Sequence, residues 1–556
     1  MTAIYIQHHN SGMFVRAKRS VVKGAAYEYL QIVRSYREGG KVKQQIIGSL
    51  GRRDRLLASG ELDGLLKSLA GFSKKLKVVE VVRESGLAAR TAKTWGPALV
   101  FGRLWERQGL PEILGKLAQG RKFEFDLERA AFALALQRLC APGSDLQGSG
   151  WVQTVAAPGL EGLALQHFYR TTAFLAQVRQ DLERKLFLRD RNLFNQTLDL
   201  VFIDTTSLYC YRDEETELRR RGYSRDRRPE LPQLVLCVAV DSQGWPMAWE
   251  VFPGNTADAA ALRQVVDLLR ARFQIGRVAV VADRGMISQE TMKLLKDHET
   301  APFDYVLGCK LRRSKEVREE VLSRGGRYQK VADNLEVKEV RVKERRYVVC
   351  RNPREARKDA AARQALVEKL KATLAREGGK GLMANRGFAR FLKTAKGSVS
   401  LDEAALAADA RLDGKFVLTT NTEMPAAEVA LTYKSLWRVE RTFREQKSTL
   451  EVRPLYHQRD DTCVGHIVAS FLALRLEVDL QRRLEKQGAE VSWPDLMRDL
   501  QQVQAVIVEL DGHSYQLRTD LKGAAYQAFA AAGVRPPPAV SPLETQPESD
   551  PLTSSA

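Results

Sequence analysis

Three carboxylate residues stand in sequence contexts where they could bind a divalent metal ion. Asp204 closes the apolar run LDLVFID, Asp283 closes the apolar run RVAVVAD, and Glu440 lies within YKSLWRVERTFREQK. A near-continuous apolar run predicts a strand buried on both faces, and a carboxylate at the end of such a strand needs a cation or hydrogen-bond donors. Together, the three residues predict a divalent-metal site that could act on phosphodiester bonds.

The elements that would position these carboxylates differ in kind. The runs 198–204 and 277–283 predict two strands, and an Arg-Gly pair ends the second one before a helix that we expect to begin at Ser288. Glu440 falls instead within a helix expected over 426–449. Residues spaced three and four apart share one face of that helix: Tyr433, Leu436, Trp437, Glu440, Phe443 and Lys447.

Each of the three carboxylates also has a purely structural explanation. An aspartate after an apolar strand is most often a turn former or a helix cap. A glutamate on a helix with a basic neighbour is usually a solvated charge. Two strand-end aspartates, one helix-borne glutamate and a basic helix face in one basic chain favour the metal site over three separate structural roles.

The composition indicates a polyanionic partner. The chain of 556 residues has 88 Lys and Arg against 68 Asp and Glu, which gives a formal net charge of +20. Nucleic acid fits this charge better than a membrane does, because no segment approaches the run of about 18 apolar residues that a spanning helix requires. The N-terminus also lacks a signal-peptide pattern, so we expect a cytoplasmic protein. The six cysteines are dispersed, which predicts neither a zinc site nor a disulfide framework.

The order of predicted elements between 196 and 310 indicates an α/β catalytic core with a mixed sheet. Three strands are followed by a helix, a strand, a second helix and a strand, which matches the ribonuclease-H-like fold. Asp241 begins the turn DSQG, so we assign it to hairpin chemistry and not to the metal site. The core is interrupted by an α+β insertion, and a strand near 415–422 leads back to the helix of Glu440.

The remaining segments suggest regions that flank this core. A basic β-rich segment contains a hairpin with a Glu-Gly-Gly turn, and a helical segment follows that could recognise a DNA end or simply pack on the core. The insertion contains a Lys- and Arg-rich stretch, 338–358, for which a solvated hairpin is one explanation. The expected divisions are a β-rich unit 1–76, a helical unit 77–195, a catalytic domain 196–310 with 413–480, an insertion 311–412, a helix and hairpin region 481–535, and a disordered tail 536–556.

The motifs resemble those of a known family. The segments FIDTTSLYCY, VVADRGMIS and RPLYH are similar to those of bacterial insertion-sequence transposases of the DDE type, in the group with a Tyr-Arg-Glu-Lys signature. Tyr433, Glu440 and Lys447 fall on that signature, spaced Y-x2-R-x3-E-x6-K, whereas Leu436 occupies the arginine position. The resemblance covers most of the chain and is weakest at the C-terminal tail.

The resemblance implies a catalytic and metal-binding triad of Asp204, Asp283 and Glu440 that binds two Mg²⁺ ions, with Mn²⁺ as a substitute. It implies double-stranded DNA as the partner, both the terminal inverted repeats of the element and its target, with a homodimer in the synaptic complex at the bacterial nucleoid and no membrane. The residues that could contact DNA are Tyr433, Lys447, Arg438, Arg441 and Arg284. The resemblance also implies that the insertion helps to hold the DNA end, and the stretch 338–358 is compatible with that role.

Two other functions remain open at this stage. A related metal-dependent nuclease would cut DNA without strand transfer. A catalytically silent DNA-binding protein derived from a transposase would act as a repressor, although the three carboxylates argue against a silent site.

Overall fold

The computed structural model describes residues 12–22, 25–38, 41–70, 72, 88–194, 200–273, 279–283, 303–377, 382–395, 398–510 and 513–543. Its contacts divide the chain into two compact units, which are described separately. The first unit consists of Met1–Ala92, Val506–Arg518 and Pro538–Ala556, and the second of Lys93–Ala505 and Thr519–Pro537. The expected helix near Ser288 and the residue Arg284 lie outside the described residues.

The first unit contains an antiparallel sheet of the strands β1 (Gly12–Val22), β2 (Ala25–Glu38) and β3 (Lys41–Arg52). Glu38 pairs with Lys41, which confirms the hairpin expected at the Glu-Gly-Gly turn. The helices α1 (Arg53–Ala58) and α2 (Glu61–Ala70) follow.

A second sheet contains β4 (Ala88–Thr94), β16 (Gln504–Leu510), β17 (His513–Arg518) and β18 (Val540–Leu543), in the order β18-β17-β16-β4. Strand β18 lies in the segment that we expected to be disordered. Its apolar residues Val540 and Leu543 allow four residues of this Pro-rich tail to pair with β17 as an edge strand. The end of the chain from 544 onward lies outside the described residues.

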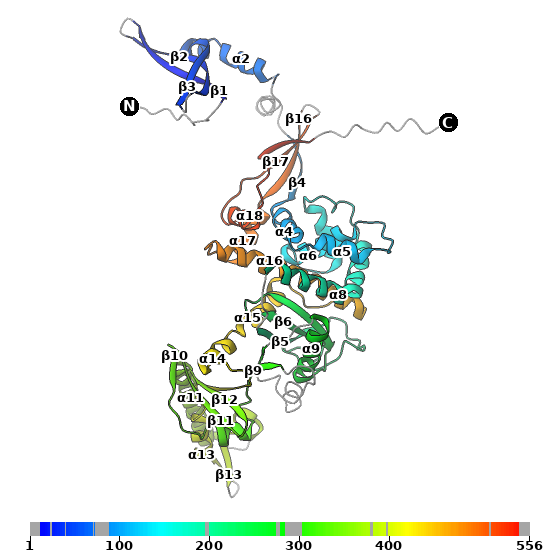
Figure 1. Cartoon of the computed structure of the whole chain (residues 1–556), viewed down its shortest axis with the longest axis vertical. Coiled ribbons are helices and arrows are strands. Elements are labelled where there is room, and N and C mark those ends of the chain that lie inside the picture. The colour runs from blue at the N-terminus through cyan, green and yellow to red at the C-terminus, as the bar shows by residue number, and fades with distance from the viewer. Residues whose placement is uncertain are drawn as a thin grey trace, which may run out of the picture. The chain divides into compact units, whose positions relative to one another are not determined.

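Helices form one layer of the second unit (Figure 1). The residues of α6 are buried almost all round, as expected for the apolar sequence LERAAFALALQRLC. Helices α8 and α16 pack on each other and on α6. The helices of this layer are α4 (Gly96–Arg107), α5 (Leu110–Ala118), α6 (Leu127–Cys140), α7 (Asp145–Trp151), α8 (Leu165–Phe194), α16 (Asp460–Lys486), α17 (Trp493–Gln501) and α18 (Ala525–Ala532), with a 3-10 turn at Val152–Thr154.

A mixed sheet forms the centre of the second unit, with nine strands in the described part of the chain. Strand β5 pairs antiparallel with β6 and parallel with β8, and β8 pairs parallel with β9. The strands, in sheet order, are β10 (Gln329–Ala332), β11 (Leu335–Val342), β12 (Arg345–Arg351), β15 (Lys415–Thr420), β9 (Asp304–Gly308), β8 (Ala279–Ala282), β5 (Leu200–Tyr209), β6 (Gln233–Asp241) and β7 (Pro246–Pro253). The order β9-β8-β5-β6-β7 is that of a ribonuclease-H-like core, as the sequence predicted.

The strands of the expected insertion continue this sheet, because β12 pairs antiparallel with β15. A π-helical turn (Val317–Val321) packs on these strands, where Val317 and Val321 share a core with Val340 and Tyr347. The rest of the insertion forms a small separate core, in which Leu370 of α11 packs with Phe391 and Leu406. The elements of this part are α11 (Pro353–Glu377), a 3-10 turn (Leu382–Ala384), α12 (Arg386–Ala389), β13 (Leu392–Ala395), β14 (Ser398–Leu401) and α13 (Glu403–Ala410).

Helices cover both faces of the central sheet, and Figure 1 shows α9 and α15 on either side of β5 and β6. On one face, α9 (Asp258–Phe273) packs on residues such as Ile203 and Ala282. On the other face, α15 (Trp437–Arg444) packs on residues such as Phe202 and Val281. Successive side chains of a strand point to opposite faces, so the residues that follow Ile203 and Ala282 point toward α15.

Two predictions about these elements were wrong. Strand β5 does not end at Asp204, because Thr205 to Tyr209 continue its pairing with β6. The helix expected over 426–449 is divided into α14 (Ala426–Lys434), α15 and a π-helical turn at Glu445–Thr449. The hydroxyl of Ser435 donates to the carbonyl of Leu431, a bond of the kind with which serine bends helices. Among the described residues, no helix is long and apolar enough to cross a bilayer.

Candidate active site

The sheet brings two of the predicted site residues side by side. The parallel pairing of β5 with β8 ends with Ile203 opposite Ala282. One residue further along come Asp204, in the middle of β5, and Asp283, directly after β8. Both point to the face of the sheet that α15 covers, because side chains alternate along each strand.

Glu440 reaches the same region from α15. Val439 and Phe443 are buried against the sheet, and this anchors the helix while Glu440 stays exposed. All three predicted carboxylates line one cavity of about 240 Å³. The residues lining it are Asp204, Asp283, Phe416, Tyr433, Lys434, Leu436, Trp437, Val439 and Glu440.

Asp204 lies in an environment that disfavours its ionised form. Burial raises its pKa to about 6, and the neighbouring carboxylates of Asp283 and Asp258 add to this rise. The guanidinium of Arg225, with Nη1 at 4.0 Å from Oδ1 of Asp204, opposes it, as does the backbone N–H of Thr205, which donates to the same oxygen at 2.7 Å. One partly buried carboxylate, with two exposed carboxylates on the same cavity and its nearest guanidinium at 4.0 Å, fits a divalent cation, which prefers oxygen ligands.

Arg225 is a neighbour of the site that the sequence did not single out. Its Nη2 donates to Oγ1 of Thr205 at 2.8 Å and to both carboxylate oxygens of Asp258 at 3.1 Å. Thr205 in turn donates to Oδ1 of Asp258 at 2.7 Å. Arg225 belongs to a long loop after β5, so nothing in the spacing of the sequence indicates that it returns to Asp204. Lys434 and Phe416 were also missed.

The residues predicted to contact DNA are distributed over different places. Tyr433 lines the cavity, and its hydroxyl donates to Oδ1 of Asp283 at 2.7 Å. Lys447 lies outside the cavity, in the π-helical turn, where its Nζ is 3.1 Å from Oδ1 of Asp226. Burial lowers the pKa of Lys447, and the contact with Asp226 opposes this. The DNA-binding roles of both residues stay predictions.

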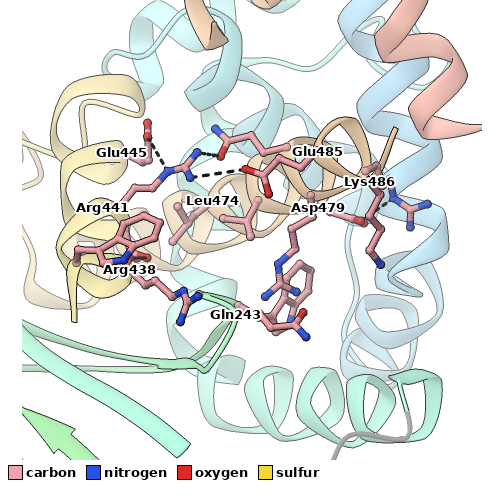
Figure 2. A pocket seen from close by; sticks show the side chains of 16 residues that line it. Gln243, Arg438, Arg441, Glu445, Leu474, Asp479, Glu485 and Lys486 are labelled. Carbon is pink, nitrogen blue, oxygen red and sulfur yellow. Dashed lines mark hydrogen bonds and ion pairs between the residues drawn. The ribbon is translucent and has the colours of Figure 1, made fainter. Parts of the chain in front are cut away.

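Arg438 and Arg441 line a second, larger cavity of about 750 Å³, bounded by α15, α16 and the β6–β7 turn. Nε of Arg441 is 3.7 Å from Oε1 of Glu445, and its Nη1 is 3.8 Å from Oε1 of Glu485. Figure 2 shows Arg441 between these two carboxylates. Its Nη2 also donates to Gln481 at 2.5 Å. Arg441 is thus engaged within the protein, whereas Arg438 has no carboxylate partner among the described residues.

A different group of residues is gathered more closely than the triad. Potential ligand atoms of Asp145, His457 and His466 lie within 4.8 Å of one another. However, Nη2 of Arg138 is 3.2 Å from both Oδ1 of Asp145 and Nδ1 of His466. A guanidinium in this position would repel a metal ion, so we interpret the group as a buried polar network and not as a metal site.

Comparisons with known proteins agree with the resemblance. A family described as "Transposase DDE domain" matches residues 195–476, half of the chain, and the "IS1634 family transposase, N-terminal domain" matches residues 15–85. No curated protein matches the sequence. A solved structure, "Mos1 transposase paired-end complex with left transposon end", is 15% identical over 33% of this chain, with a TM-score of 0.13. The chain spans only 60% of the length of that transposase.

The match to the DDE domain contains Asp204, Asp283 and Glu440, and the matched N-terminal segment contains the three-stranded sheet except for the first three residues of β1. The chain therefore belongs to the insertion-sequence transposases of the DDE type.

Proposed function

We propose that this transposase binds the terminal inverted repeats of an insertion sequence and catalyses metal-dependent cleavage of the DNA strand and its transfer to a target. The observation that carries the proposal is that Asp204, Asp283 and Glu440, from a strand, a strand end and a helix, line one cavity. The chain's net charge of +20 supports a polyanionic substrate. The same proposal implies action at the bacterial nucleoid, in the cytoplasm.

The three carboxylates would hold two Mg²⁺ ions, or Mn²⁺ in their place. When bound, such ions activate water or a 3′-hydroxyl as the nucleophile and stabilise the leaving 3′-oxygen. The chain itself supplies the geometry: the pairing of β5 with β8 fixes Asp204 beside Asp283, and the buried face of α15 fixes Glu440 opposite them. No side chain needs to act as a covalent nucleophile.

The rim of the cavity could hold the DNA strand in place. Lys434 is exposed there, and Trp437, with a relative exposure of 51%, lines both this cavity and the larger one that contains Arg438. Cationic side chains bind phosphate oxygens, and an exposed aromatic ring can stack on a base. We propose Lys434 and Arg438 as phosphate contacts, with Lys447 and Arg441 as contacts that would first have to leave their carboxylate partners. A homodimer would join two element ends.

The test incubates the full-length protein with labelled duplexes that carry candidate element ends and with a supercoiled target, in Mg²⁺ or in EDTA. The wild type should nick the end and yield joined products only with metal. Asp283→Ala should lower cleavage by at least about 10³-fold, because it removes several kcal/mol of charge stabilisation in the transition state. Binding of the end in EDTA should change little.

Glu428→Gln is a matched control, because Glu428 is an exposed carboxylate on α14 that does not line the cavity. It should leave cleavage and joining unchanged. Nicking without joined products would identify a nuclease, and binding of the element ends without any metal-dependent cleavage would identify a silent DNA-binding protein. Either result would refute the proposed strand transfer.

A further inference from the structure

Tyr433 is held in place by two strands of the central sheet. Its ring stacks on that of Phe416 in β15, with 5.8 Å between the ring centroids and an angle of 26° between the planes. Aromatic pairs with this spacing restrict both side chains. Phe416 and Tyr433 both line the cavity and both pack against the main hydrophobic core, so the stack anchors one side of the site to that core.

Gly308, the last residue of β9, makes room for the hydroxyl of Tyr433. A Cβ atom on Gly308 would lie 2.3 Å from the Tyr433 oxygen and 2.9 Å from Cζ. The parallel pairing of β8 with β9 ends with Ala282 opposite Leu307, and one residue further come Asp283 and Gly308. The position beside Asp283 in the sheet is therefore the one without a side chain, and the tyrosine hydroxyl occupies that space.

The hydroxyl then meets the predicted metal ligand. It donates to Oδ1 of Asp283 at 2.7 Å, a short and well-formed hydrogen bond. Asp283 is exposed and follows the last paired residue of β8, so the ladder does not fix its side chain. A second hydrogen-bonding partner of this kind orients a metal ligand and limits its rotamers.

We propose that Tyr433 is a positioning residue for Asp283, which it orients toward a divalent cation, and that Gly308 and Phe416 are the residues that make this bond possible. The inference rests on the proposed metal site of Asp204, Asp283 and Glu440. It differs from the DNA contact that the family signature implies for Tyr433. A positioning role predicts that loss of the hydroxyl weakens metal binding and leaves metal-free DNA binding intact.

The experiment measures Mn²⁺ binding to the full chain without DNA, by the electron paramagnetic resonance of free Mn²⁺, and measures end binding by gel shift in EDTA. Tyr433→Phe keeps the ring and its stack and removes only the hydroxyl. Its Mn²⁺ dissociation constant should rise by about 10-fold, as for other residues that orient metal ligands. End binding should change by less than about twofold, and saturating Mn²⁺ should restore cleavage.

Gly308→Ala provides an independent variant, because the added methyl group would displace the hydroxyl of Tyr433 and leave the tyrosine itself unchanged. It should also weaken Mn²⁺ binding, and the effects of the two changes should be less than additive in the double variant, since both remove one interaction. Tyr456→Phe is the matched control. Tyr456 is 50% exposed and stacks on Tyr211, away from the cavity, so its loss of a hydroxyl should change neither measurement.

Asp283→Ala distinguishes a failure of the proposed metal site from a failure of the positioning role of Tyr433. If it loses the Mn²⁺ site while Tyr433→Phe binds Mn²⁺ like the wild type, the positioning role is refuted and the proposed metal site stands. Weaker DNA binding by Tyr433→Phe in EDTA with unchanged Mn²⁺ affinity would likewise refute it in favour of a DNA contact. If Asp283→Ala keeps the wild-type Mn²⁺ affinity, both the metal site and this inference fail.

Discussion

Lys447 and Asp226 form an ion pair that joins two segments 221 positions apart, with Nζ and Oδ1 separated by 3.1 Å. The other oxygen of Asp226 is 3.2 Å from Nε of Arg453. One largely buried carboxylate therefore pairs with two cations, Lys447 and Arg453. Asp226 directly follows Arg225, whose guanidinium reaches Asp204. The pair thus connects the end of the helix of Glu440 to the loop that carries Arg225.

This arrangement predicts unequal effects of removing either partner. Asp226→Asn leaves two partly buried cations facing each other, and should lower the free energy of unfolding by about 1–3 kcal/mol. Lys447→Gln leaves Asp226 paired with Arg453 and should cost less. Urea denaturation of both variants measures the difference. Equal losses would mean that Arg453 contributes nothing to holding Asp226.

Asp204→Asn should raise the stability of the metal-free protein and abolish its cleavage activity. Burial beside Asp283 and Asp258 raises the pKa of Asp204 to about 6, so keeping it ionised at pH 7.5 costs folding free energy. Asparagine keeps the oxygen that accepts from Thr205 and removes the charge. We expect the metal-free protein to become more stable by roughly 1–2 kcal/mol, and cleavage to be lost.

Thermal unfolding in EDTA and in Mg²⁺ checks this prediction. The wild type should gain stability on addition of Mg²⁺, and Asp204→Asn should gain much less, because a ligand stabilises the state that binds it. A variant that is less stable than the wild type in EDTA would show that Arg225 more than compensates the charge of Asp204.

Binding of the element ends should depend steeply on salt. With a net charge of +20, the protein is expected to neutralise several phosphates, and each contact releases a counterion. Six or more contacts would lower the affinity by about 10³-fold between 50 and 200 mM salt. A gel-shift titration with potassium chloride measures the slope, and sucrose at matched osmolality serves as the control. A flat response would contradict a binding surface made of Lys and Arg.

Much of the catalytic sheet could be predicted from the sequence, because its strands are continuous apolar runs separated by turn residues. The segment 200–209 illustrates the limit of this signal. The apolar run stops at Asp204, but Thr205 and Thr206 are β-branched residues that extend the strand, and pairing with β6 makes this extension favourable. The position of Asp204 in the middle of β5 is therefore decided by a partner strand, which the run itself does not reveal.

The sequence predicted which three carboxylates come together, but not which residues surround them. Asp204, Asp283 and Glu440 lie on one cavity because strand register and helix packing bring them together. Lys447 was expected on the same helix face as Glu440, but the π-helical turn that begins at Glu445 lies between them and changes the direction of the side chains that follow Glu440. Arg225 contacts Thr205 through the path of a loop, and no periodicity in the sequence encodes such a contact.

A buried carboxyl group on α16 gives a prediction about pH. Glu477 is buried, and burial raises its pKa well above its ordinary value, with a further rise caused by the carboxylate of Glu445. Arg441, at 3.7 Å from Glu445, and Gln481, which donates to Oε1 of Glu477 at 3.1 Å, oppose this rise. Glu477 is thus protonated in the folded protein at a pH where the unfolded chain has lost that proton.

Because Glu477 takes up a proton on folding, the free energy of unfolding decreases as the pH rises. Stability contributed by Glu477 is fully present below its ordinary pKa of 4.5 and falls as the pH rises toward the folded pKa, by up to about 1.4 kcal/mol per pH unit. Glu477→Gln imitates the protonated acid and can still donate to Glu445. It should therefore be more stable than the wild type at pH 8, by about 1–3 kcal/mol, and the difference should shrink toward pH 5.

Urea denaturation at pH 5, 6.5 and 8 measures this convergence. Glu428→Gln is the control, since Glu428 is an exposed carboxylate on α14 and should not change the pH dependence. If Glu477→Gln were less stable than the wild type at every pH, Glu477 would be ionised in the folded protein, and Arg441 would have to stabilise both it and Glu445. In that case the charges of Glu445 and Glu477 would both depend on Arg441, and a DNA phosphate that bound Arg441 would weaken its pairing with these two carboxylates.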